Sequence, residues 1–208
     1  MIPFEIASVF FIASVLLALA PGPDNIFVLT QSALHGKGAG LLVTIGLCTG
    51  LLVHTTAVSL GVAAVFKTSS LAFNLLKAVG AMYLLYLAWQ SFRAGTAAIP
   101  KDEISSLSQL QLYVRGLIMN VTNPKVAIFF LAFLPQFADP ARGSLTLQIF
   151  LLGALFLLAA LIVFGSIAMG AGFLGEWLRK SRRVQVIMNW VAGTVFIVLA
   201  LKLLSTAH

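Results

Sequence analysis

Six long apolar stretches constrain what this chain can fold into more than any other feature of its sequence. They cover roughly residues 6–34, 39–66, 71–92, 115–137, 145–174 and 186–204. Each is close to or longer than the ~20 apolar residues with which a helix crosses the hydrocarbon core of a bilayer. Only 9% of the 208 residues are charged and 60% are hydrophobic, whereas a soluble domain carries about 25% charged residues. The sequence therefore predicts an all-α membrane protein, residues 1–208 forming one domain with six transmembrane helices.

The basic residues lie in short loops between the apolar stretches, where they determine orientation. The net charge is +7, but Lys and Arg form no patch interleaved with aromatic residues, so we expect no nucleic-acid partner. Because Lys and Arg accumulate on the cytoplasmic side, the loops after the first, third and fifth stretches are predicted to be cytoplasmic and both termini periplasmic, in a multi-pass protein of the bacterial inner membrane. The predicted cytoplasmic set is Lys37, Arg93, Lys101, Arg115, Arg179, Lys180, Arg182 and Arg183, against Lys67, Arg142 and Lys202 on the opposite side.

The two halves of the chain resemble each other. Pro23-Asp24 and Pro124-Lys125 occupy corresponding places in the first and fourth stretches, and residues 80–88 echo residues 193–201. With three spans in each half, the second copy has to enter from the opposite side. We therefore predict two inverted three-helix repeats, about 1–95 and 114–208, whose first and fourth helices are interrupted. The polar linker between them, about 96–113, is predicted to be cytoplasmic, either as a short amphipathic helix starting near Asp102 and Glu103 or as a plain loop.

Cys48 is the only cysteine of the chain. A single cysteine excludes a disulfide within one chain, a CxxC redox pair and a cysteine metal cluster. We expect no metal ligands and no cofactor. The oligomeric state is left open, with a homodimer as one alternative.

The first apolar stretch is interrupted by Pro21, Gly22, Pro23, Asp24 and Asn25. The two prolines remove backbone donors and so free carbonyl groups one turn earlier, and the glycine permits an unwound turn. Asp24 then stands near the start of a second half-helix, where the exposed N–H groups favour an anion. Capping alone rarely justifies a carboxylate at the membrane centre, where it costs roughly 2.5–3.5 kcal/mol, so we predict a substrate- or proton-binding role for this segment.

The fourth apolar stretch carries a matching interruption, with Asn120, Asn123, Pro124 and Lys125. Lys125 lies ten residues after Arg115, or roughly 15 Å into the bilayer at ~1.5 Å per residue. Two arrangements remain open for its ammonium group. It either pairs with Asp24, which lies at a similar depth, or meets only the carbonyl groups that the broken helix frees.

His54 and Lys77 are the other candidate site residues. His54 shares a helical face with Gly46, Gly50 and Gly61, and small residues allow close helix packing. It is therefore predicted to point into the bundle, either as a packing residue or as a proton- or substrate-binding one. Lys77 either snorkels to the outer interface or belongs to the site, whereas Phe129, Phe130, Phe133 and Phe137 are interpreted as packing residues.

These interruptions resemble the motifs of the LysE/RhtB family of amino-acid exporters. The first match is the Pro21–Asn25 segment after an apolar N-terminal helix, and the second is Asn123-Pro124-Lys125 followed by Phe129-Phe130 and Pro135-Gln136-Phe137. A third match begins at Lys77 and includes Gly80 and Tyr83, and the resemblance covers the whole chain. It implies export of amino acids or their derivatives, such as homoserine, threonine, leucine or lysine, driven by the proton motive force.

A channel and an intramembrane enzyme are the competing interpretations. An aspartyl protease needs two carboxylates within the bilayer, but Asp24 is the only acid clearly inside an apolar stretch. A serine hydrolase would have to recruit His54 with Ser59 or Ser166, without a supporting motif. A channel for small metabolites would differ from an exporter because its flux is driven by the concentration gradient alone. The sequence favours an exporter that is not an enzyme, with amino acids, protons and the lipid bilayer as partners and a channel as the alternative.

Overall fold

The computed structural model describes residues 2–68, 70–94, 107–180 and 182–205, and every regular element within these ranges is a helix. Five of these elements are long helices of at least 16 residues, and two of the shorter ones are 3₁₀-helices and one a π-helix. In chain order the elements are α1 (Phe4–Leu19), α2 (Pro23–His35), α3 (Lys37–Thr68), α4 (Ser70–Arg93), α5 (Gln109–Val121), α6 (Pro124–Ile128), the π-helix η1 (Phe129–Phe133), the 3₁₀-helices η2 (Leu134–Phe137) and η3 (Pro140–Arg142), α7 (Leu145–Lys180) and α8 (Arg182–Ser205).

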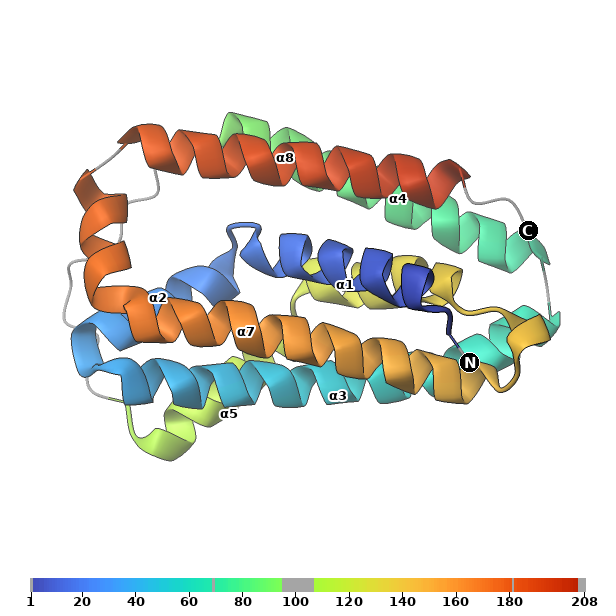
Figure 1. Ribbon diagram of the computed structural model, residues 1–208, viewed down its shortest axis with the longest axis horizontal. Coiled ribbons are helices and arrows are strands. Elements are labelled where there is room, and N and C mark those ends of the chain that lie inside the picture. The colour runs from blue at the N-terminus through green and yellow to red at the C-terminus, as the bar shows by residue number, and fades with distance from the viewer. Residues whose placement is uncertain (1, 69, 95–106, 181, 206–208) are drawn as a thin grey trace.

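The helices pack in roughly parallel pairs along the long axis of the molecule (Figure 1). Helices α3 and α7 lie side by side, with α5 packed against α3, and α4 and α8 form a second pair on the opposite side. Helix α1 lies between the two pairs, close to the segment from α6 to η2. The first turn of α1 and the last turn of α8 lie at the same end of the bundle.

Glycines bring α3 and α5 into close contact. A Cβ atom at Gly116 would lie 2.5 Å from the carbonyl oxygen of Val43, and a Cβ atom at Gly50 would lie 2.6 Å from the side-chain oxygen of Asn120. Real Cβ atoms do not approach so closely, so neither position admits a larger residue without a shift of the helices. The predicted small-residue face of α3 is therefore buried at Gly46 and Gly50, but the same face is exposed at Gly61.

Three helices are long and apolar enough to cross a membrane, and the count rises to five if each of two bent helix pairs is taken as one span. The three lie within α3, α7 and α8. The bent pairs are α1 with α2, at 62°, and α5 with the segment Pro124–Phe137, at 48°. The predicted interruptions of the first and fourth apolar stretches are thus confirmed as helix breaks. These helices make the chain a multi-pass membrane protein, with three to five spans among the described residues.

The start of α5 differs from the predicted start of the fourth apolar stretch at residue 115. The helix already begins at Gln109, because Ser108 caps it: the Ser108 hydroxyl accepts from the Gln111 N–H, and the Gln111 side chain accepts from the Ser108 N–H. Such a capping box satisfies two donors that a helix start leaves open. The predicted helix start near Asp102 and Glu103 lies outside the described residues.

A cluster of phenylalanines fills the space around η1, as the sequence predicted. The Phe129 ring lies 4.7 Å from that of Phe133 and 5.2 Å from that of Phe156, and the Phe10 ring of α1 lies 5.1 Å from that of Phe137. These side chains are nearly inaccessible to solvent. The cluster fixes the π-helical segment η1 against α1 and α7, directly after the break between α5 and α6.

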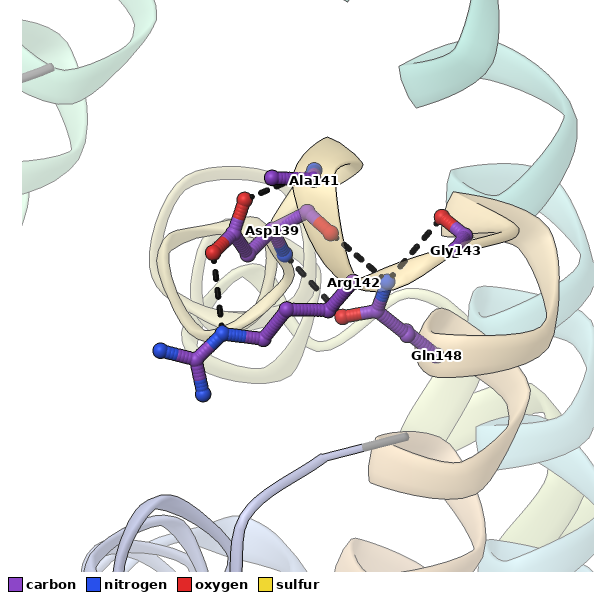
Figure 2. Close-up of polar contacts among 5 residues, drawn as sticks. All are labelled: Asp139, Ala141, Arg142, Gly143 and Gln148. Carbon is purple, nitrogen blue, oxygen red and sulfur yellow. Dashed lines mark hydrogen bonds and ion pairs between the residues drawn. The ribbon is translucent and has the colours of Figure 1, made fainter.

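A polar network closes the connection between η2 and α7 (Figure 2). The buried side chain of Gln148 accepts from the Asp139 N–H and donates to the carbonyl oxygens of Asp139 and Gly143. The Asp139 carboxylate accepts from the Ala141 N–H and pairs at 2.9 Å with the Arg142 side chain. Gly143 has a φ of 114°, which favours glycine. The network fixes this loop and leaves Asp139 and Arg142 partly exposed, away from the helix breaks.

Candidate functional site

The first helix break follows from the two prolines of residues 21–25. Because Pro21 has no N–H, the carbonyl of Leu17 lacks its usual donor one turn later. Helix α1 ends at Leu19, the chain extends through Gly22, and α2 begins with Pro23 in its first turn. The side chain of Asn25 satisfies one carbonyl group at the break, since its amide nitrogen donates to the carbonyl oxygen of Ala18 at 2.8 Å.

The second helix break has the same local order. Helix α5 ends at Val121, Asn123 caps α6 and Pro124 occupies its first turn. Since Pro124 has no N–H, the carbonyl of Asn120 loses its helical donor. That carbonyl accepts instead from the backbone N–H of Asn123 at 3.0 Å, and the Nε2 atom of His54 lies 3.2 Å from it. His54 therefore connects α3 to the second break.

The ammonium group of Lys125 joins the two breaks. Its Nζ atom donates to the carbonyl oxygens of Ala20, at 3.1 Å, and of Leu17, at 3.4 Å. These carbonyls lie at the C-terminal end of α1, which carries the negative end of the helix dipole. A Cβ atom at position 22 would lie 3.3 Å from the same Nζ atom, so Gly22 leaves the space that the ammonium group needs.

The carboxylate of Asp24 is held by Asn123 rather than by Lys125. The Nδ2 atom of Asn123 donates to Oδ2 of Asp24 at 2.9 Å, while the Oδ1 atom of Asn123 caps α6 by accepting from the Lys125 N–H at 3.0 Å. Within the described part of the chain, Asp24 and Lys125 make no ion pair. Of the two arrangements that the sequence left open for Lys125, the structure contains the one with freed carbonyls. The direct ion pair is therefore wrong.

The polar side chains at the breaks are largely closed off from solvent. The exposed fractions are 1% for Asn120, 2% for Asp24, 6% for Asn123 and 9% for Lys125. His54 is half-buried, and its ring lies 5.6 Å from that of Phe130. Most of the predicted site residues thus meet at one place: Pro21, Gly22, Pro23, Asp24, Asn25, His54, Asn120, Asn123, Pro124 and Lys125.

Lys77 lies on α4, which is not one of the helices that border the two breaks. It is 8% exposed and precedes Gly80, where an added Cβ atom would collide with Ala132 of η1. The buried position argues against a side chain that snorkels into solvent. Its role in the site stays a prediction.

Three buried side-chain oxygens at the breaks have no hydrogen-bond donor among the described residues. They are Oδ1 of Asp24, Oδ1 of Asn25 and Oδ1 of Asn120. Buried polar atoms are hydrogen-bonded in most proteins, and each exception calls for an explanation. All three are hydrogen-bond acceptors, so the breaks combine one bound ammonium group with acceptor oxygens that have no donor among the described residues.

A group of buried polar residues on the second half of the first apolar stretch was not predicted from the sequence. Thr30 and Gln31 of α2 are 4% and 0% exposed, and neither the Thr30 hydroxyl nor the Gln31 amide has a hydrogen-bond partner among the described residues. The available signal was the spacing of Gln31 from Asp24, because residues seven apart share a helix face. Gln31 therefore adds a polar group on the Asp24 side of α2.

Comparison with known proteins identifies the family of the chain. The family model for LysE type translocators matches residues 15–207. The chain is 32% identical over 205 residues to a homoserine/homoserine lactone efflux protein of Salmonella typhimurium and to one of Salmonella typhi, covering 99% of this chain and 98% of each relative. It is also 33% identical over 188 residues to a membrane protein of Vibrio cholerae, covering 90% of both chains. No solved structure matches. With the family model matched over nearly its whole length, this chain belongs to the LysE type translocator family.

Proposed function

We propose that the chain exports amino acids or small amino-acid derivatives across the bacterial inner membrane, and that they bind between the two helix breaks. One observation carries the proposal: a buried ammonium group, that of Lys125, lies in the same cluster as side-chain oxygens that lack donors. A zwitterion has the complementary groups. The names of the Salmonella relatives make homoserine and homoserine lactone the first substrates to test.

Each end of a zwitterion finds a counterpart at the breaks. The substrate carboxylate would bind the Lys125 ammonium, which presently donates to the carbonyls of Leu17 and Ala20. The substrate ammonium has only donors, and it would bind the unpaired oxygens of Asp24, Asn25 and Asn120. Hydrogen bonds to charged groups contribute about 1.5–3 kcal/mol each, which offsets part of the cost of bringing a zwitterion into the membrane.

Asp24 is our candidate for the proton carrier of a transport cycle driven by the proton motive force. Of the acidic side chains that the structure describes, Glu5 is exposed, Asp139 is partly exposed and Asp24 is buried. A proton on Asp24 would remove the negative charge that attracts the substrate ammonium, so proton and substrate would compete for one site. Their opposite preferences could then bias two states of the transporter. His54, next to the carbonyl of Asn120, is the alternative proton site.

We further propose six membrane spans in two inverted repeats, 1–95 and 114–208, with α4 as the third span. The equivalent positions of Asp24 and Lys125, each following a proline at the start of a half-helix, support the repeat. Helix α4 buries one side against α8 and exposes an apolar stripe that suits contact with lipid. That stripe consists of Leu71, Leu75, Val79, Met82, Leu85, Tyr86 and Trp89.

The closed site implies motion of one half of the bundle against the other. Asp24 and Lys125 are nearly inaccessible, so a substrate reaches them only in a second conformation. In transporters built from inverted repeats, rocking of one repeat opens the central site to either side in turn. The short contact of Asp24 with Asn123 joins the two proposed repeats, and its exchange for substrate contacts would favour the rocking.

Both chain ends are expected on the periplasmic side. This follows from the excess of Lys and Arg after the first, third and fifth apolar stretches, and it agrees with the first turn of α1 and the last turn of α8 lying at one end of the bundle. A reporter enzyme fused after Ala94 should report a cytoplasmic location, and the same reporter fused after His208 a periplasmic one. If both fusions report the same side, the six-span arrangement is wrong.

Export itself is testable in intact cells. Cells that overproduce the protein should accumulate homoserine, or a related amino acid, in the medium at several times the level of cells with an empty vector. We expect this increase because a larger number of transporters raises the outward flux of the substrate. The measurement is a profile of extracellular amino acids at equal cell density. A profile that matches the empty-vector cells for every amino acid and lactone measured would contradict the proposed function.

A further inference from the structure

Gln31 is a fully buried polar side chain that the sites described above leave unused. It is 0% exposed, and both the donor Nε2 and the acceptor Oε1 lack a hydrogen-bond partner among the described residues. Leaving a buried polar group unsatisfied costs about 1–3 kcal/mol. An apolar side chain of similar size would avoid that cost, so the amide calls for a partner that the described part of the chain does not provide.

Of the two polar neighbours of Gln31 on α2, the Thr30 hydroxyl also lacks a partner among the described residues, whereas Ser32 is satisfied. The hydroxyl of Ser32 donates to the carbonyl oxygen of Val28 at 2.7 Å, as serines and threonines within helices commonly do. Ser32 is also wedged against α3, because a Cβ atom at Gly40 would collide with the Ser32 hydroxyl and contact Ala168 of α7. Ser32 is thus a satisfied packing residue, whereas Gln31 next to it is equally buried and unsatisfied.

Gln31 lies on the same face of α2 as Asp24. The two residues are seven apart, which is close to two helical turns and about 10 Å along the axis. Side chains of a helix tilt toward its N-terminus and cover the preceding turn. A Gln31 side chain that follows this rule covers the turn that leads back toward Asp24 and the first break.

We propose that Gln31 is a substrate-binding residue, which recognises the polar side chain of the transported amino acid by donating and accepting a hydrogen bond. The inference rests on the proposed function and adds a specificity determinant to it. A hydroxyl group both donates and accepts, and so does a primary amide. The Asp24 region would hold the ammonium and carboxylate groups common to all amino acids, and Gln31 would select those with a hydroxyl or a comparable polar group.

The test compares two amino acids that differ in one hydroxyl, L-homoserine and L-2-aminobutyrate. Each competes with labelled homoserine for exchange by the purified protein in proteoliposomes, and the ratio of their inhibition constants gives the selectivity. Gln31→Leu and Gln31→Met remove the amide but keep an apolar side chain of similar size. Each should reduce the selectivity for homoserine about 3- to 10-fold, which corresponds to one neutral hydrogen bond.

Ser32→Ala is the matched control, because it alters a buried polar neighbour whose hydrogen bond is already satisfied within α2. Its selectivity should stay within twofold of the wild type. An unchanged selectivity in both Gln31 variants would overturn the inference, and so would failure of both to fold, which would assign Gln31 a structural role. A wild-type protein that exchanges neither amino acid would overturn the proposed function and this inference together. If the wild type exchanges both, the selectivity of the Gln31 variants tests this inference separately.

Discussion

Replacing Asp24 with asparagine is expected to abolish proton-driven export while leaving some exchange of substrate across the membrane. The amide of an introduced asparagine has the size of the carboxylate, and its oxygen can still accept from Nδ2 of Asn123, which now donates to Asp24 at 2.9 Å. The fold and the contact between the two breaks should therefore persist. What is lost is the group that takes up and releases a proton.

The measurement is transport of labelled homoserine in proteoliposomes, once with an imposed pH gradient and once as exchange without one. Gradient-driven flux of Asp24→Asn should fall to the level of protein-free vesicles. Asp139→Asn is the matched control, because Asp139 pairs with Arg142 in the partly exposed loop of Figure 2, and its flux should stay within twofold of the wild type. Full gradient-driven flux by Asp24→Asn would contradict the assignment and move the proton site to His54.

Replacing Lys125 with methionine should abolish gradient-driven export and weaken the exchange of substrate across the membrane. Lys125 lies in the first turn of the helix that begins at the second break, and its ammonium donates to Ala20 and Leu17 at the first break. Without it the two carbonyls lose their donor, and a substrate carboxylate loses its counter-charge. A hydrogen bond to a charged group is worth about 1.5–3 kcal/mol, so substrate binding should weaken about 10- to 100-fold.

Lys37→Met provides the comparison for this variant, since Lys37 is an exposed lysine at the start of α3. The apparent affinity for homoserine in the exchange assay should change strongly for Lys125→Met and by less than twofold for Lys37→Met. The amount of folded protein, measured by size-exclusion chromatography in detergent, separates a loss of binding from a loss of structure. Equal affinities in the wild type and Lys125→Met would exclude a role for this ammonium in substrate binding.

The positions of the helix breaks could be predicted because their cause is local. Pro21, Pro23 and Pro124 lack the N–H that a continuous helix needs, whatever the rest of the molecule does. The sequence also indicated that Asp24 and Lys125 lie near each other, since both are charges deep within apolar stretches. The breaks lie where the prolines predict them, and Asp24 and Lys125 lie in one cluster, because Asn123 binds Asp24 and Lys125 binds Ala20.

The partners of those charges could not be predicted, because they depend on where the breaks meet in space. When only the charged residues are considered, an ion pair between Asp24 and Lys125 gives each charge a partner. The same prolines, however, free carbonyls that compete for the ammonium, and Lys125 donates to two of them. Asn123 caps α6 with its oxygen, and this fixes its amide nitrogen toward Asp24. The side-chain amide of Asn123, and not the Lys125 ammonium, is therefore the partner of the Asp24 carboxylate.

The burial of Gln31 could not be predicted for a different reason. One amide within a largely apolar stretch is compatible with a side chain that faces solvent, a neighbouring helix or a binding site. Its complete burial follows from the packing of α2 within the bundle, where α3 and α7 are its main neighbours. The start of α5 was placed too late because hydropathy does not register a capping box, which depends on Ser108 and Gln111 rather than on apolar residues.

Uphill transport by the purified wild-type protein is the decisive measurement for proton-driven export. Proteoliposomes are loaded with labelled homoserine and suspended in the same concentration of it, and the external medium is then acidified. We expect a net loss of homoserine from the lumen, because protons that enter through the Asp24 site drive the substrate out. The loss should stop when an ionophore collapses the pH gradient. Homoserine that stays equal on both sides while crossing rapidly, regardless of the gradient, would contradict proton-driven export and identify a channel.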